Sequence, residues 1–103
     1  MRVLIVSRHK STVELLTQML SGKTESIRVT DHLSSIDEIQ EDIVIGNLPI
    51  EMIEQVLAAG KRFVLVSLNV PRELRGQELD IEQLKQYMKL KEIKELKIED
   101  FSI

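Results

Sequence analysis

The sequence alternates short, uninterrupted apolar runs with segments of helical periodicity, and this alternation sets the fold class. Val3 to Val6 is a continuous β-rich run, which is typical of a strand buried on both faces of a sheet. Similar runs follow at Ile27 to Val29, Ile43 to Ile45 and Phe63 to Leu68, with a weaker one at Ile93 to Ile98. Strands separated by helices predict an α/β fold. We expect one Rossmann-like domain over residues 1–103, with three layers, a five-stranded mostly parallel sheet and about three helices.

Capping signals predict where the helices begin and end. Ser11 with Glu14 three residues later is typical of a capping box, and Gly22 is a suitable helix end. Pro49 predicts the start of a second helix, whose buried positions are then Ile50, Ile53 and Leu57, with Gly60 as its end. Asp80 is expected to cap a third helix that carries Ile81, Leu84 and Met88.

The strand order stays open between 2-1-3-4-5 and 3-2-1-4-5. Residues 34–41 are too few for more than one helical turn, so the connection between the second and third strands is short. A parallel crossover normally needs a dozen residues or more. The short connection therefore favours neighbouring or antiparallel strands at this point.

Composition excludes several classes of protein. The net charge is −3, whereas a binder of long nucleic acid needs a wide basic surface. Cysteine is absent, which excludes disulfides and thiolate metal sites and suits a reducing compartment. The N-terminal apolar run is too short for a secretory signal or a membrane span. We therefore expect a soluble, unprocessed, cytoplasmic protein that binds neither a membrane nor long nucleic acid.

The charges are unevenly distributed along the chain. Residues 32–60 carry six acids and neither Lys nor Arg. Ligands of open α/β sheets bind outside the carboxyl ends of the strands. Both histidines and several cationic side chains follow predicted strands at that edge; the candidates are Ser7, Arg8, His9 and Lys10 after the first strand, His32 after the second, Asn47 after the third, and Asn69, Arg72 and Arg75 after the fourth.

The loop after the first strand predicts a phosphate site. It opens a helix, where free N–H groups and the positive end of the helix dipole lie, and Arg8, His9, Lys10 and Ser11 add polar and cationic groups. Other interpretations stay open. The basic residues can simply keep a turn soluble, Asn47 can cap a helix, and Arg75 with Gly76 can form a structural turn in which glycine supplies a positive φ.

Familiar catalytic motifs are missing. The sequence has no dinucleotide fingerprint, no P-loop and no G-x-S-x-G, and its two histidines lack the spacing of a metal site, so no metal or other cofactor is expected. A phospho-receiver domain would place acids where Ser7-Arg8 and Gly46-Asn47 stand. Arg8-His9 resembles the Arg-His-Gly opening of the histidine phosphatases, although Lys10 replaces the glycine.

Four segments in order carry a more specific resemblance. They are Ser7-Arg8-His9, Asp31-His32-Leu33, Gly46-Asn47-Leu48-Pro49, and Pro71 to Leu79 with its Arg75-Gly76-Gln77-Glu78-Leu79. This order resembles a family of small CRISPR-associated accessory proteins of type III systems, which are Rossmann-like ring nucleases. The resemblance covers residues 3–79. That family often has Pro-Gly-Ala after Arg-His, where this chain has Lys10-Ser11-Thr12.

The resemblance implies degradation of a cyclic oligoadenylate, most simply cyclic tetra-adenylate, by a metal-independent homodimer. Cleavage switches off antiviral signalling and leaves linear adenylates with a 2′,3′-cyclic phosphate. Arg8 and His9 would be the catalytic residues: Arg8 and the helix N–H groups would bind phosphate, and His9 would transfer protons because histidine titrates near neutral pH. In the competing view His9 only positions phosphate, and the reaction depends on geometry alone. Lys10, Arg72 and Arg75 would hold further phosphates, Asn47 would contact ribose or adenine, and Ser7, Ser11, His32 and Asn69 would complete the ligand site.

Two other functions fit the same residues. A sensor or sponge would bind the cyclic messenger without cutting it, and a histidine-type phosphatase would form a phosphoenzyme at His9. A structural α/β protein whose loops simply meet water is the remaining interpretation.

Overall fold

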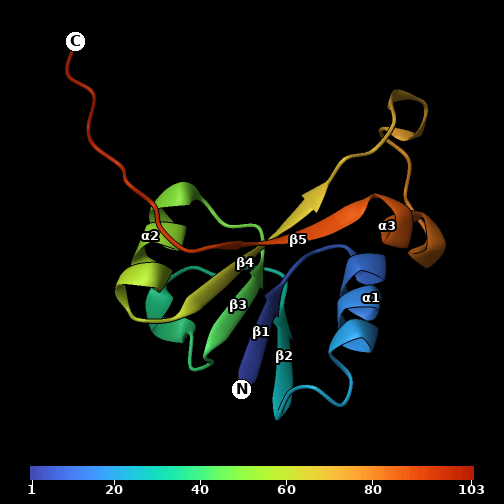
Figure 1. Ribbon diagram of the computed structural model, residues 1–103, viewed down its shortest axis with the longest axis horizontal. Helices are drawn as coiled ribbons and strands as arrows, with labels where there is room; N and C mark the ends of the chain where they lie inside the picture. Colours follow the sequence, from blue (N-terminus) through green and yellow to red (C-terminus); the bar gives the residue numbers. More distant parts are fainter.

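Val3, Leu4 and Ile5 are completely buried at the centre of a five-stranded sheet, as their uninterrupted apolar run predicts. The computed structural model describes residues 1–103 and has the strand order β2-β1-β3-β4-β5 (Figure 1). Strands β1 to β4 are parallel, and β5 runs antiparallel to β4. The strands are β1 (Arg2–Val6), β2 (Ser26–Thr30), β3 (Ile43–Gly46), β4 (Arg62–Leu68) and β5 (Met88–Ile93). The predicted fold class is confirmed.

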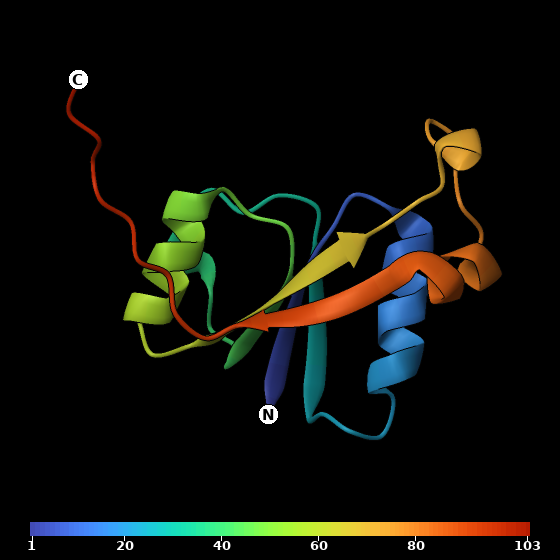
Figure 2. The same cartoon turned by 45° about the horizontal axis from the view of Figure 1, so that its top comes forward.

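Helices cover both faces of the sheet. Helices α1 (Lys10–Leu20) and α3 (Ile81–Tyr87) lie on one face, and α2 (Ile50–Ala58) lies on the other with the 3-10 turn η1 (Ile36–Glu38) (Figures 1 and 2). A core of Leu4, Val44, Val56 and Phe63 fills the α2 side, and one of Val3, Ile5, Leu16 and Val66 fills the α1 side. No helix has the length and apolar character that crossing a membrane requires.

The connection from β2 to β3 corrects the expected topology. Strands β2 and β3 flank β1 and are both parallel to it, so they are neither neighbours nor antiparallel. The connection is residues 31–42, which meets the length of about a dozen that a parallel crossover needs. It crosses the sheet with Leu33 and Ile39 buried against the α2-side core, and η1 is its single helical turn. Only the 2-1-3-4-5 alternative was right.

Ion pairing fixes both ends of that connection. The Arg28 guanidinium of β2 donates to both carboxylate oxygens of Glu41, at 2.7 and 3.0 Å, and to the Glu38 carbonyl oxygen at 2.8 Å. Glu41 is buried, and the Arg28 guanidinium holds its pKa below the ordinary value. Glu41 lies just before β3, at the amino edge of the sheet. The ion pair therefore stabilises the fold and is remote from the carboxyl edge, where a ligand is expected.

Helix α1 starts differently from its predicted cap, whereas α2 begins directly after Pro49 as expected. Helix α1 begins at Lys10 with His9 as its N-cap, and no side chain caps it, so the Ser11 capping box was wrong. Helix α2 has Pro49 as its N-cap, so Asn47 does not cap it. Ile50 is 51% exposed, whereas Val56 is completely buried and faces the core in its place. Asp80 caps α3 as expected, in a capping box with Gln83.

The last strand was misplaced. The strand is Met88–Ile93, and only Ile93 of the predicted Ile93–Ile98 run belongs to it. Met88 follows α3 directly and pairs with Leu68, which lets β5 accompany β4 back to Phe63. Lys and Glu are interleaved along it because it is the edge of the sheet. Residues 94–103 have no regular secondary structure; Leu96 still packs against the α2-side core, and the C-terminal end projects away from the body of the molecule (Figure 1).

Candidate functional site

A pocket of about 580 Å³ lies at the carboxyl edge of the sheet, between the start of α1 and the segment that joins β4 to α3. The first turn of α1 and its N-cap contribute His9, Lys10, Ser11 and Thr12. The rest of the lining runs from the end of β4 into α3; it consists of Leu68, Val70, Leu74, Arg75, Gly76, Gln77, Glu78, Leu79 and Leu84. The pocket therefore joins two of the four loops that the sequence pointed to.

The N-terminus of α1 offers free hydrogen-bond donors to this pocket. The first intrahelical bond runs from the Val13 N–H to the His9 carbonyl oxygen at 3.1 Å. The His9 N–H donates to Ser7 Oγ at 3.1 Å, but no side chain accepts from the N–H groups of residues 10–12. Those residues line the pocket, so their unpaired N–H groups and the positive end of the helix dipole favour an anion there.

The opposite wall is a loop held by its own hydrogen bonds. The Leu74 N–H donates to the Pro71 carbonyl oxygen at 3.0 Å, within the 3-10 turn η2 (Arg72–Leu74). Arg75 Nε donates to the Val70 carbonyl oxygen at 3.3 Å, and this hydrogen bond holds the Arg75 guanidinium against the loop. Gly76 has a φ of +82°, which confirms the turn expected after Arg75. Loop and helix thus present Arg75 and Lys10 to one pocket, and neither cation forms a salt bridge.

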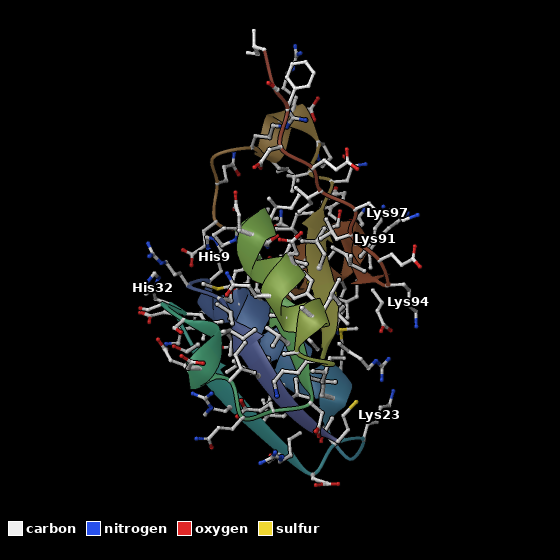
Figure 3. The ribbon with its side chains drawn as sticks, turned by 90° about the vertical axis from the view of Figure 1, so that its left-hand side faces the viewer. His9, Lys23, His32, Lys91, Lys94 and Lys97 are labelled. Carbon is white, nitrogen blue, oxygen red and sulfur yellow. The ribbon has the colours of Figure 1, made fainter.

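The structure brings together four of the predicted residues and leaves the others outside the pocket. His9, Lys10, Ser11 and Arg75 line it, and Ser7 lies behind His9 as its hydrogen-bond acceptor. His32 lies on the same side of the molecule as His9 (Figure 3), in an exposed turn bonded to the Thr30 hydroxyl. The remaining predicted residues are exposed at the carboxyl edge without lining the pocket; they are Arg8, Asn47, Asn69 and Arg72.

Sequence reasoning missed three polar residues of the pocket. Thr12 is buried in the first turn of α1, and it was missed because the helix was expected to begin with Ser11 as its cap. Gln77 and Glu78 belong to the segment that carried the family resemblance, but they were not named as candidate site residues. The signal was the turn at Gly76, which reverses the loop and brings the next two residues to the pocket.

Most of the acidic residues lie far from the pocket. Four of the six acids of residues 32–60 belong to η1 and α2, on the face of the sheet opposite α1 and α3, and the other two, Glu41 and Asp42, lie at the amino edge just before β3. Glu78 is the single acid among the lining residues, against Lys10, Arg75 and the imidazole of His9. A small anion therefore meets a locally cationic surface on a chain whose net charge is −3.

Comparison with known proteins adds one finding. No curated protein and no solved structure matches the chain. One family model, described as "Putative CRISPR-associated protein (Cas_VVA1548)", matches residues 4–98, which include every pocket residue. Because that match spans nearly the whole chain, the protein belongs to the CRISPR-associated family Cas_VVA1548.

Proposed function

We propose that the protein is a ring nuclease that cleaves cyclic oligoadenylate, with cyclic tetra-adenylate as its expected substrate, and so ends type III CRISPR antiviral signalling. One observation carries the proposal: the pocket joins the uncapped N-terminus of α1 to Arg75 of the β4–α3 loop. Membership of a CRISPR-associated family supports the signalling context.

The reaction needs few protein groups because the substrate supplies its own nucleophile. The ribose 2′-oxygen attacks the adjacent phosphorus, the bond from phosphorus to the 5′-oxygen breaks, and a 2′,3′-cyclic phosphate forms. The 2′-hydroxyl loses its proton and the leaving 5′-oxygen gains one, so the step is balanced without a co-reactant. The protein must align the three atoms and stabilise the negative phosphoryl oxygens.

The pocket residues can stabilise the phosphoryl oxygens and transfer protons in this step. Lys10, Arg75 and the free N–H groups of α1 stabilise the phosphoryl oxygens. His9 lies at the same helix start, and its imidazole can carry a proton between the 2′-oxygen and the 5′-oxygen. Arg8 precedes it on an exposed bend, and its part in phosphate binding stays a prediction.

A cleavage assay tests this function directly. The protein is incubated in excess over cyclic tetra-adenylate with EDTA, and the products are separated from the intact ring. We expect linear adenylates ending in a 2′,3′-cyclic phosphate, and rings of three and six adenylates measure size preference. An intact ring after prolonged incubation with excess enzyme contradicts the proposal.

A sensor or sponge is the second candidate, and one observation favours it. No carboxylate or carbonyl group hydrogen-bonds to the His9 imidazole, so nothing orients that ring as a proton carrier. Tight retention of the uncut ring supports this function. A separate incubation with a phosphomonoester tests the phosphatase alternative, since turnover of that substrate with an acid-labile phosphate on His9 would identify a histidine phosphatase instead.

A further inference from the structure

The apolar part of the pocket has no task in phosphate binding. Five of the lining side chains are aliphatic, and all come from the end of β4, the following loop or α3; they are Leu68, Val70, Leu74, Leu79 and Leu84. Only Leu84 is fully buried, and Leu68 is 44% exposed, so the group offers apolar surface for a ligand to cover. A nucleotide has an anionic half and a flat, largely apolar half, and this pocket has a surface for each.

The charged groups of the pocket indicate which wall faces the phosphate and which faces the base of a nucleotide. The segment that carries the aliphatic side chains also carries Arg75 and Glu78; Glu78 forms no salt bridge, so its carboxylate repels a phosphate and offsets part of the attraction of Arg75. The unpaired N–H groups and Lys10 lie on the α1 side, where a phosphate is attracted. This distribution of groups favours a nucleotide with its phosphate toward α1 and its base toward the aliphatic side chains.

The loop also fixes a polar group beside this apolar surface. Gln77 Nε2 donates to the Glu73 carbonyl oxygen at 3.3 Å, and the Gln77 N–H donates to the Leu74 carbonyl oxygen at 3.3 Å. The amide nitrogen is thus occupied within the loop, and the amide oxygen Oε1 has no protein donor. With the Glu78 carboxylate, the base side of the pocket presents acceptors.

We propose that the aliphatic part of the pocket is an adenine subsite in which Gln77 Oε1 accepts a hydrogen bond from the exocyclic N6 amine. The inference rests on the proposed function and adds the residue that selects the base. Hypoxanthine has the shape of adenine but carries an oxygen in place of the amine. That oxygen would face Gln77 Oε1, and two acceptors would be left without a donor.

The test compares binding of cyclic tetra-adenylate and cyclic tetra-inosinate, which contains hypoxanthine. We expect the native protein to bind the adenylate ring at least about tenfold more tightly. Gln77→Leu should remove this preference by weakening adenylate binding alone. Gln86→Leu is the matched control, because Gln86 is exposed on α3 and does not line the pocket. Leu74→Ala should weaken both rings equally, whereas Leu57→Ala on α2 should weaken neither.

The outcomes separate this inference from the proposed function. Equal affinity for the two rings, or an unchanged preference in Gln77→Leu, overturns the subsite while leaving ring cleavage intact. Loss of both rings in Gln77→Leu, with a native far-UV circular dichroism spectrum and melting curve, assigns Gln77 to the loop structure and also overturns it. Failure of the native protein to bind either ring contradicts the proposed function, and the subsite with it.

Discussion

His9 has two structural roles: it is the N-cap of α1, and it lines the pocket. We expect His9→Gln, which keeps a polar side chain of similar size, to retain ring binding while single-turnover cleavage falls at least tenfold. That loss corresponds to about 1.4 kcal/mol of transition-state stabilisation. The readouts are a single-turnover rate and a dissociation constant on the same samples. Unchanged cleavage would remove His9 from catalysis and leave geometry alone to drive the reaction.

Lys10 tests phosphate binding by a single side chain. Lys10→Ala should weaken binding of cyclic tetra-adenylate about tenfold, because it removes one unpaired cation from the pocket. Lys23→Ala is the control, since Lys23 follows the other end of α1 and lies on the opposite side from His9 in Figure 3. The effect of Lys10→Ala should shrink as salt is added. Equal losses in the two variants would show that only the total charge matters.

Gly46 explains why one quoted motif contains a glycine. Its φ is +154°, and a Cβ at this position would lie 2.2 Å from the Val6 carbonyl oxygen of β1. Gly46→Ala should therefore destabilise the fold by about 1–3 kcal/mol, measured by urea unfolding. Gly60→Ala, also at a positive φ but with nothing within 4 Å, should cost less. Similar losses would contradict a steric role for Gly46 at the carboxyl edge.

At the scale of elements, the contact of β4 with β5 gives a pH dependence. Arg62 donates to both carboxylate oxygens of Glu92, at 3.0 and 2.8 Å, and its guanidinium lowers the Glu92 pKa from 4.5 to about 2. A lowered native pKa means that this pair stabilises the fold above pH 4.5 and is lost as the pH falls toward 2. Glu92→Gln should therefore lose less stability than the native protein across this window.

Urea unfolding at several pH values measures that difference, and Glu95→Gln is a suitable control because Glu95 is exposed and forms no salt bridge. Parallel stability curves for the native protein and Glu92→Gln would show that the pair contributes nothing. Glu41, whose pKa is also lowered, remains in both proteins, so the comparison isolates Glu92.

The two central strands, β1 and β3, were predicted well because nearly all of their residues are buried. The runs at Val3, Ile43 and Phe63 are apolar because helices cover both faces of their strands, and this leaves a clear pattern. Strand β5 has no such run, because charged residues interrupt it at the sheet edge and Met88 also fits the apolar spacing of the helix before it. The candidate site was also predicted in part. Its place at the carboxyl edge follows from the strand ends, whereas which loops meet there depends on the packing of α1 against α3.

For the whole molecule, a net charge of −3 is compatible with the proposed anionic ligand because the charges are spatially sorted. Lys91, Lys94 and Lys97 project on the side opposite His9 and His32 (Figure 3), so these lysines are not pocket groups. The acids of α2 and η1 lie across the sheet from the pocket. The proposed phosphate site therefore depends on few groups, and single substitutions there should have large effects.

The size of the pocket leads to a prediction of stoichiometry. A volume of about 580 Å³ falls within the roughly 300–1,000 Å³ range of pockets for a single small ligand, whereas a ring of four adenylates has four bases and four phosphates. If the ring is the ligand, we expect one chain to bind only part of it and two copies to share it about a two-fold axis. Titration calorimetry should give one ring for every two chains, and native mass spectrometry should detect that complex. One ring on each chain would contradict a shared site.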